Sequence, residues 1–339
     1  MRAELIATDD PRWSSFIRGT SHDFYHLPSY VSLSARQDGA EASALLVTDG
    51  QRSMLLPLLL RAIPGSRLDA TSPYGYPGPL VSGTDQPEFM NDALGTGLEM
   101  LRSSGFVSLF VRLHPILNSV PPQTSGQVVR HGSTVSIDLT APADLLWRQM
   151  RGNHRRDISR SLDAGRRAYF DDTWSHSETF KRLYRSTMDR VSAQAHYFYA
   201  DEYFDQLRSA LGGSLKLCVV EADGAIIGAG LFVETCGTVQ YHLSGTDSDF
   251  MHEQPTKLMF HFVREWAQDR GDTRLHLGGG VGGADDSLYR FKAGFSSDRH
   301  GFHTLRAVLD DEEYGRLVAL RGDTPIAHGF FPSYRRSSP

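Results

Sequence analysis

The alternation of apolar and polar positions predicts a mixed α/β unit in the first part of the chain. Between residues 71 and 80, proline and glycine are too frequent for a helix or an interior strand. That segment carries Tyr74 and Tyr76, so we expect a rigid loop that presents two tyrosines. Around it, a helical pattern covers 88–103, and strand-like runs cover 44–48, 54–63, 107–113 and 133–139.

A long basic helix is predicted after residue 140. Thr140 suits a helix N-cap, Pro142 a first helical turn, and Gly165 the position just after a helix end. We therefore expect one helix to about Ala164. Its apolar stripe recurs at multiples of four residues, as Leu146, Met150, Ile158 and Leu162. A basic stripe runs beside it, formed by Arg148, Arg151, Arg155, Arg156 and Arg160.

The rest of the pattern is helix, helix, three strands, helix and strand. Helices are expected at 178–191, 201–210 and 255–268, and strands at 215–221, 226–234, 239–243 and 274–277. The sequence Ala-Asp-Gly at 222–224 is a hairpin signal between the first two strands. This order resembles the GNAT acetyltransferase fold, and the first half of the chain can be interpreted as a looser copy. We therefore predict an α/β (α+β) protein of two GNAT-like domains.

The domain boundaries are placed by these elements. A length of 339 residues suits two domains better than a single core. We expect an N-terminal domain over 1–139 and a C-terminal domain over 140–303. A further strand-like run at 304–309 suggests that 304–325 returns to the first domain, and 326–339 is expected to be a tail.

Composition indicates the cellular compartment in which the protein is expected. No run of about 18 apolar residues occurs, so no membrane insertion is expected. The first ten residues are charged and lack the apolar core of a signal peptide. Cys218 and Cys236 lie in strand-like segments, which favours reduced thiols and a cytoplasmic protein. A net charge of −5 gives no overall attraction to nucleic acid, and the oligomeric state is left open.

A glycine-rich loop near the C-terminal end is the most distinctive segment. Five of the six residues at 278–283 are glycine, which permits positive φ and close backbone approach to a ligand. A short helix can begin at Ser287 and would carry Lys292. The loop has neither P-loop nor dinucleotide-binding spacing. On its own it could equally be a tight connection.

Taken in order, several segments resemble the FemABX family. They are the basic segment 153–165, the strand 241–246, the helix 255–267, and the glycine loop that leads into 288–295 (LYRFKAGF). The resemblance covers about residues 20 to 310 and is strongest after residue 140. It implies two GNAT-like domains around a cleft. It also implies amide-bond formation from aminoacyl-tRNA to an amine of a peptide-like or small-molecule acceptor, with no other cofactor and no metal.

The resemblance assigns roles to four residues near the glycine loop. Lys292 and Tyr241 would polarise the ester carbonyl or stabilise the oxyanion, and Gly279 and Phe291 would contact the substrate. A tRNA-borne ester is already activated, so no covalent enzyme intermediate is needed. The structural alternatives are a surface lysine whose stem packs on Phe291 and a tyrosine that serves packing alone.

Other residues are assigned to the acceptor and the tRNA. Arg190 and Tyr197 would grip a phosphate or carboxylate of the acceptor, which an arginine fork suits. Tyr74 and Tyr76 would line the cleft from the first domain. Arg151, Arg155 and Arg156 would meet the tRNA backbone, since phosphate contacts need clustered cations. A helix-terminal arginine, interface tyrosines and a solvated basic face are the alternatives. Segment 30–37 offers only Arg36, which weakens the case for a nucleotide-linked acceptor.

Competing functions are tested against the same residues. A thioester-dependent N-acyltransferase that uses CoA needs glycines before its long helix, whereas 251–257 has none and contains Glu253 and Pro255. A carrier-protein thioester and a non-catalytic binding module stay open as alternatives. The histidines show no metal-ligand spacing, and no GxSxG nucleophile motif occurs.

Overall fold

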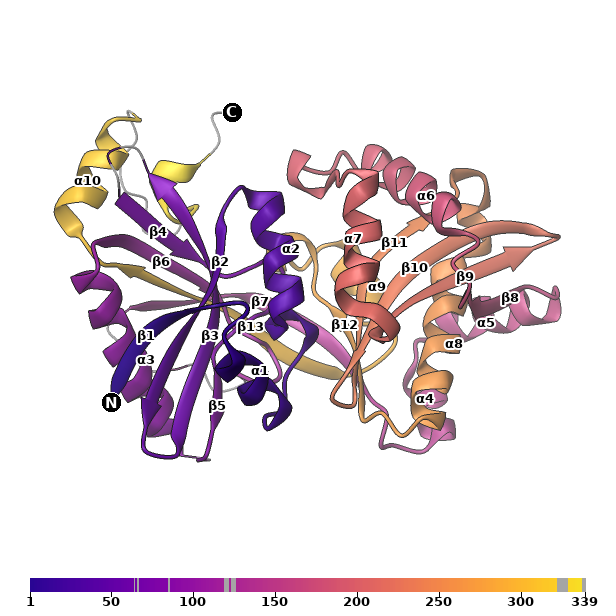
Figure 1. Ribbon diagram of the computed structural model, residues 1–339. Coiled ribbons are helices and arrows are strands. Elements are labelled where there is room, and N and C mark those ends of the chain that lie inside the picture. Colours follow the sequence, from indigo (N-terminus) through magenta and orange to yellow (C-terminus); the bar gives the residue numbers. More distant parts are fainter. Residues whose placement is uncertain are drawn as a thin grey trace. The chain divides into compact units, whose positions relative to one another are not determined.

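The chain folds into two compact units. The computed structural model describes residues 1–339 except 64, 66, 85, 119–121, 123–125, 322–328 and 337–339. Unit 1 comprises Met1–His131 with Gly301–Pro339, and unit 2 comprises Gly132–His300 (Figure 1). The chain passes between the units within two strands, β7 (Gln127–Asp138) and β13 (Asp298–Val308). The domain boundaries expected from the sequence, after residues 139 and 303, lie close to these crossing points.

Unit 1 is a mainly antiparallel sheet with helices on both faces. Its strand order is β1-β2-β3-β4-β6-β13, β5 pairs with β3, and only β4 and β6 are parallel. Helix α3 packs on one face, and α1 and α2 pack on the other. The elements are β1 (Arg2–Ala7), α1 (Pro11–Arg18), α2 (Pro28–Asp38), β2 (Glu41–Asp49), β3 (Arg52–Ile63), β4 (Arg67–Thr71), β5 (Leu80–Ser82), α3 (Pro87–Ser103), β6 (Phe106–Arg112) and α10 (Asp311–Ala319).

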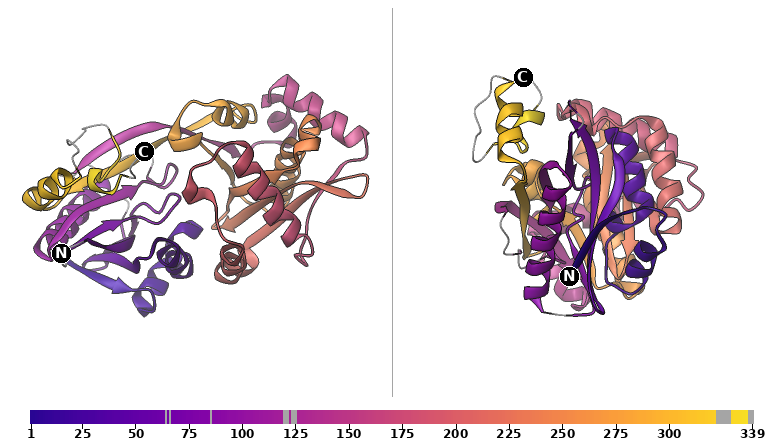
Figure 2. Two further views of the ribbon diagram at one scale, coloured as in Figure 1. Left: turned by 90° about the horizontal axis from the view of Figure 1, so that it is seen from above. Right: turned by 60° about the vertical axis from the view of Figure 1, so that its left-hand side comes forward.

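The C-terminal segment packs on unit 1 (Figure 2). Tyr334 is buried, and its hydroxyl donates to Asp69 at 2.9 Å. Arg335 donates to the same carboxylate at 2.6 Å. Residues 329–336 therefore do not form the tail that the sequence suggested, because they neutralise and satisfy a buried Asp69. Residues 326–328 and 337–339 of that predicted tail lie outside the described residues.

Unit 2 follows the element order expected from the sequence, except that two helices replace the one predicted over 140–164 and that β8 was not predicted. Its strand order is β7-β12-β11-β10-β9-β8, with β11 and β12 parallel and the other neighbours antiparallel. The elements are α4 (Ala143–Gln149), α5 (Gly152–Asp163), β8 (Arg167–Phe170), α6 (Ser177–Arg190), α7 (Asp201–Leu211), β9 (Leu215–Ala222), β10 (Ala225–Thr235), β11 (Thr238–Thr246), α8 (Pro255–Asp269), β12 (Arg274–Gly278) and α9 (Ser287–Lys292).

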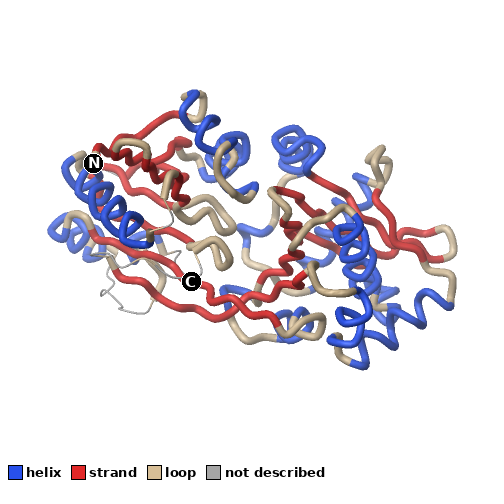
Figure 3. The backbone as a smooth tube through the Cα atoms, turned by 90° about the horizontal axis from the view of Figure 1, so that it is seen from below, coloured by secondary structure: helices blue, strands red, loops and turns tan. Residues whose placement is uncertain are grey.

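Helices α6 and α8 cover opposite faces of this sheet (Figure 3). A Cβ atom on Gly230 of β10 would lie 2.7 Å from Met259 of α8. A Cβ atom on Gly245 of β11, which pairs with Ala229, would lie 2.2 Å from Leu183 of α6. Neighbouring strand residues point to opposite faces, so glycine lets each helix approach its own side closely.

The prediction of one continuous helix over 140–164 is wrong. The structure has two helices, α4 and α5, because Met150 and Arg151 are extended, with ψ of 145° and 142°. The Arg151 amide donates to the Gly294 carbonyl at 2.8 Å instead of continuing a helix. Thr140 bonds Asp138 rather than capping the helix, and Leu162 is 48% exposed. The predicted apolar stripe is therefore interrupted.

Strands β11 and β12 separate at the point that positions the site. Their parallel pairing covers Thr238–Gln240 against Arg274–His276, whereas β11 stays paired with β10 as far as Thr246. Tyr241 is the first β11 residue beyond the parallel pairing. The glycine loop follows the end of β12, so the separation brings the loop and Tyr241 into one neighbourhood.

Candidate active site

Lys292 is buried, not on the surface. It ends α9, and its side chain is 6% exposed. The ammonium donates to the Gly279 carbonyl at 2.7 Å and lies 5.4 Å from the centre of the Tyr241 ring. Burial lowers the pKa of Lys292 from 10.5 to about 8, although the nearby Asp286 carboxylate opposes this shift. The expectation that a surface lysine could explain this position is therefore wrong.

Tyr241 faces Lys292 from β11. Its hydroxyl shares a short hydrogen bond with the Ser244 hydroxyl, and its ring packs edge-on against Phe260 of α8 at 4.7 Å. Burial raises the pKa of Tyr241, so the phenol stays protonated at neutral pH. A neutral phenol beside a buried ammonium can donate a hydrogen bond to a developing oxyanion.

The glycine loop, which holds the Lys292 ammonium at Gly279, makes close backbone approaches to neighbouring segments. A Cβ atom on Gly279 would lie 3.0 Å from the Ser133 carbonyl oxygen, and one on Gly280 would lie 2.2 Å from that of Ala284. Gly278 has a φ of 75°, which favours glycine. Phe291 is half-buried, and the centre of its ring lies 5.5 Å from that of Phe295. Gly279 and Phe291 thus neighbour Lys292, as expected from the sequence, while their contact with a substrate stays a prediction.

Two further residues in this neighbourhood received no role in the sequence-based prediction. Ser244 bonds the Tyr241 hydroxyl, and Asp286 caps α9 through a 2.8 Å bond from the Tyr289 amide. The capping role has a sequence signal, because an Asp directly before a helical pattern is a usual N-cap. The Ser244 contact depends on β-strand geometry and has no such signal.

Arg190 and Tyr197 lie near the far end of β11. Arg190 is exposed at the end of α6 and donates to the Thr246 carbonyl at 3.2 Å. Tyr197 is half-buried, and its carbonyl accepts a 2.8 Å bond from the Tyr184 hydroxyl. The structure thus brings Arg190 to the same strand that carries Tyr241. The grip of both residues on an acceptor stays a prediction.

The predicted basic face is divided. Arg151 lies at the start of α5 and donates to the Arg290 carbonyl at 3.0 Å, whereas Arg148 lies on α4. Arg155 is half-buried and Arg156 is exposed on α5. The five arginines therefore do not share one helical face, because the chain is extended between the two helices. Arg151, Arg155 and Arg156 remain the residues predicted to contact RNA.

The two predicted loop tyrosines belong to unit 1. Tyr74 is 37% exposed, and its carbonyl accepts a 3.1 Å bond from the Tyr30 hydroxyl. Tyr76 is half-buried, with its ring 5.4 Å from that of Phe302. Gly75 between them needs its φ of 98°, and a Cβ atom there would lie 2.0 Å from Tyr25. The loop is packed against other side chains of unit 1, while its rigidity and its role at an acceptor stay predictions.

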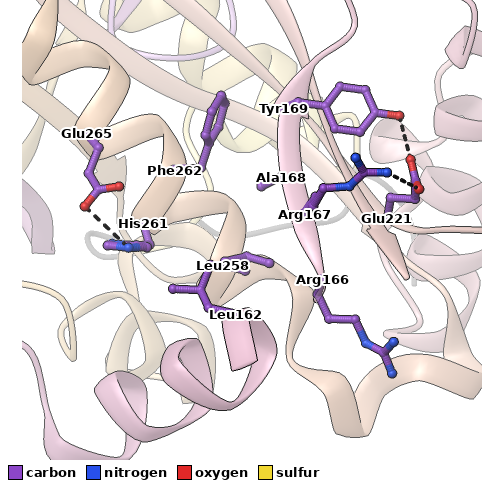
Figure 4. Close-up of a pocket in the computed structure, with 10 residues that line it drawn as sticks. All are labelled: Leu162, Arg166, Arg167, Ala168, Tyr169, Glu221, Leu258, His261, Phe262 and Glu265. Atoms are coloured by element: carbon purple, nitrogen blue, oxygen red, sulfur yellow. Dashed lines mark hydrogen bonds and ion pairs between the residues drawn. The ribbon is translucent and has the colours of Figure 1, made fainter. Parts of the chain in front are cut away.

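Unit 2 also contains a pocket of about 640 Å³ that the sequence did not suggest (Figure 4). Several of its polar groups contact one another. Arg167 and Tyr169 bond Glu221 at 3.0 and 3.2 Å, and His261 lies 3.4 Å from Glu265. Burial and Arg264 lower the pKa of His261 to about 4, so its imidazole is neutral. None of the predicted site residues lines this pocket.

Within the residues that the structure describes, no three His, Cys, Asp or Glu side chains gather as metal ligands. No helix among those residues has the length and apolar character needed to cross a membrane.

Comparison with known proteins identifies the class of fold. Residues 148–293 match the acetyltransferase (GNAT) domain family. A crystal structure of FemX is 13% identical, with a TM-score of 0.70, and the match covers 94% of this chain and 100% of that one. L-PGS from Bacillus licheniformis is 12% identical, with a TM-score of 0.55 and coverage of 93% and 97%. None of the curated proteins matches the sequence.

A third neighbour has two such domains in one chain. A tandem GNAT protein from the clavulanic acid biosynthesis pathway is 13% identical, with a TM-score of 0.50 and coverage of 91% of this chain and 99% of that one. Most of unit 2 therefore matches a GNAT domain, within a chain of mixed α/β fold. The resemblance to FemABX proteins predicted from the sequence is confirmed by the FemX-like fold of nearly the whole chain.

Proposed function

We propose that this protein is an aminoacyltransferase that forms an amide bond, with aminoacyl-tRNA as donor and an amine of a peptide-like or small molecule as acceptor. The observation that carries the proposal is Lys292, a buried ammonium placed beside Tyr241 under a glycine loop. A cation kept in an apolar site needs a reason beyond stability, and a site that develops negative charge supplies one.

The chemistry proposed for the site uses these groups only for charge and position. The acceptor nitrogen attacks the ester carbonyl carbon, and the carbonyl oxygen becomes an oxyanion. Lys292 and the Tyr241 hydroxyl stabilise that oxyanion. The intermediate then collapses, the bond to the ribose oxygen breaks, and the proton lost by the amine goes to that oxygen. No covalent enzyme intermediate is formed.

The start of α8 supports tRNA over CoA as donor. A CoA-dependent GNAT enzyme would bind pyrophosphate on free amides there. In this chain Gln254 adopts a left-handed conformation with φ of 55°, Pro255 at the first helical position has no amide hydrogen, and the Glu253 carboxylate lies 3.1 Å from Arg166. Lys257 is bound to Asp157 at 2.6 Å. An acid and a proline at this position disfavour a pyrophosphate.

A transfer assay with ribonuclease tests the donor. The purified protein is incubated with tRNA, synthetases, ATP, a labelled amino-acid mixture and a small-molecule extract of the source cell. We expect label transfer that ribonuclease abolishes and that Lys292→Met reduces by at least about tenfold, or about 1.4 kcal/mol of barrier. Lys216→Met, on β9, is the matched control and should transfer normally. Transfer that survives ribonuclease and requires CoA would instead establish the thioester alternative.

The RNA contact is tested by salt dependence. We propose that Arg155 and Arg156 contact tRNA phosphates together with Arg151, which lies beside them at the start of α5. Replacing Arg155 and Arg156 by alanine should raise KM for aminoacyl-tRNA and reduce the slope of log KM against log salt by about 2. Arg148→Ala is the control, because its side chain is bound to Asp144 at 2.7 Å on α4. An equal effect of both variants would argue against this face.

A further inference from the structure

Asp286 joins the glycine loop to the helix that carries Lys292. One carboxylate oxygen accepts the Tyr289 amide at 2.8 Å and so caps α9. The other accepts the Val281 amide, also at 2.8 Å, and so reaches back into the loop. A single side chain therefore bonds both segments. An N-cap needs only the first of these bonds.

The loop is shaped to admit this carboxylate. A Cβ atom on Gly280 would lie 2.4 Å from the Asp286 carboxylate oxygen, so any larger residue there would displace it. At the other end of α9, Lys292 bonds Gly279 at 2.7 Å. The loop is thus held to α9 at two points, through Asp286 at the start of the helix and Lys292 at its end.

The negative charge of Asp286 also raises the pKa of Lys292 and so opposes the lowering that burial causes. The charged and titratable groups that face Lys292 are Asp286, which precedes α9, and Tyr241 of β11. From helix α8, the apolar Phe260 ring contacts Tyr241. The adjacent carboxylate Asp285 is different, because it is 72% exposed and bonds Arg290 at 3.1 Å on the surface.

We propose that Asp286 is a positioning residue of this site, which locks the glycine loop onto α9 and so holds the Lys292 ammonium against the Gly279 carbonyl and beside Tyr241. Asp286 acts through Lys292 and need not touch the substrate. The importance of this position for catalysis rests on the proposed function. The positioning itself does not, and it can be measured without any substrate.

The small number of lysines makes a direct measurement practical. The chain has four lysines, so a protein labelled with ¹³C at lysine Cε gives four signals, each assigned by one Lys→Arg variant. The Lys292 signal is titrated in the native protein, in Asp286→Asn and in Asp285→Asn. Asparagine at 286 can still cap α9, but it carries no charge, and an NH₂ donor replaces one of the two oxygens that accept the loop and helix amides. Circular dichroism checks that each variant is folded.

In Asp286→Asn, we expect the Lys292 titration midpoint to fall by about half a pH unit or more, because the opposing carboxylate is gone. Asp285→Asn should leave the midpoint unchanged. Asp286→Glu, which keeps the charge on a longer side chain, should keep the midpoint closer to native. A midpoint that stays native in Asp286→Asn, or that moves equally in Asp285→Asn, would overturn the proposal.

Kinetics then separate this proposal from the proposed function. With a transfer assay in hand, Asp286→Asn should lower kcat by about tenfold with little change in KM for the donor, because position and not binding is altered. A normal kcat together with a native Lys292 midpoint would overturn the positioning role while the transferase function stood. A shifted midpoint in a protein without transfer activity would support the positioning role and count against the function.

Discussion

Two equally buried lysines of unit 2 have opposite surroundings. Lys257 of α8 is 5% exposed and bonds the Asp157 carboxylate at 2.6 Å. Lys292 is 6% exposed and bonds only the Gly279 carbonyl, with no carboxylate within ion-pair distance in the part of the chain that the structure describes. Lys181 of α6 resembles Lys257, since it bonds Glu178 at 2.9 Å. Burial alone therefore does not distinguish Lys292; the missing ion pair does.

The difference separates a lysine that supports the fold from one that weakens it. A buried charge that is paired recovers part of its lost hydration, whereas one bound to a neutral carbonyl recovers less. The lowering of the Lys292 pKa from 10.5 to about 8 corresponds to about 3 kcal/mol of stability lost at pH 7. A position that loses so much stability is a candidate for function.

The largest change in the free energy of unfolding is expected for Lys292→Met. Methionine fills a similar volume without charge, so the free energy of unfolding at pH 7 should rise by up to about 3 kcal/mol. Urea unfolding followed by circular dichroism measures it. The same variant should lose transfer activity, so that stability and activity move in opposite directions. A clear loss of stability would show instead that Lys292 has a structural role.

The second test measures how the free energy of unfolding depends on pH. The Lys292 pKa is lower in the folded state than in the unfolded state, so below about pH 8 both states bind the proton and the full penalty is present. Between about pH 8 and 10.5 only the unfolded state binds it, and stability therefore rises with pH. The difference between Lys292→Met and the native protein should shrink across this window. A difference independent of pH would contradict the assigned pKa.

A smaller change of opposite sign is expected for Lys257→Met. Removing this ammonium leaves Asp157, whose side chain is 20% exposed, with the longer 3.5 Å pairing to the exposed Arg160. Stability at pH 7 should fall by about 2 kcal/mol, less than for a fully buried pair. The double variant with Asp157→Asn should recover part of the loss, as measured by urea unfolding. If Lys257→Met were as stabilising as Lys292→Met, the ion pair with Asp157 would not distinguish the two lysines.

The smallest effect is expected on the surface. Arg148 and Asp144 form an ion pair of 2.7 Å on α4, with side chains that are 66% and 69% exposed. Arg148→Ala should change the free energy of unfolding by less than about 0.5 kcal/mol, because water screens such pairs. A larger change would mean that exposed pairs matter more in this protein than the comparison assumes. Unfolding in low and high salt distinguishes the two cases.

The sequence predicted unit 2 better than unit 1. Its strands and long helices follow clear periods of two and 3.6 residues, and β9, β10, β11, α8 and β12 lie where the pattern placed them. In unit 1 the apolar pattern did not predict β1, α1, α2, β4, β5 or α10. The helix break at Met150 was also missed, because the Gly294 carbonyl that takes the Arg151 amide is remote in sequence.

By itself, the sequence determined the elements that carry the site residues. The strand period placed Tyr241, the glycine run marked the loop, and the helical pattern after Ser287 placed Lys292, since each of these is a local property of neighbouring residues. Only the tertiary structure decided that Lys292 is buried beside Tyr241 and bound to a carbonyl, while Lys257 is buried beside a carboxylate. Burial and pairing depend on segments that are distant along the chain, so no local pattern can distinguish these two lysines.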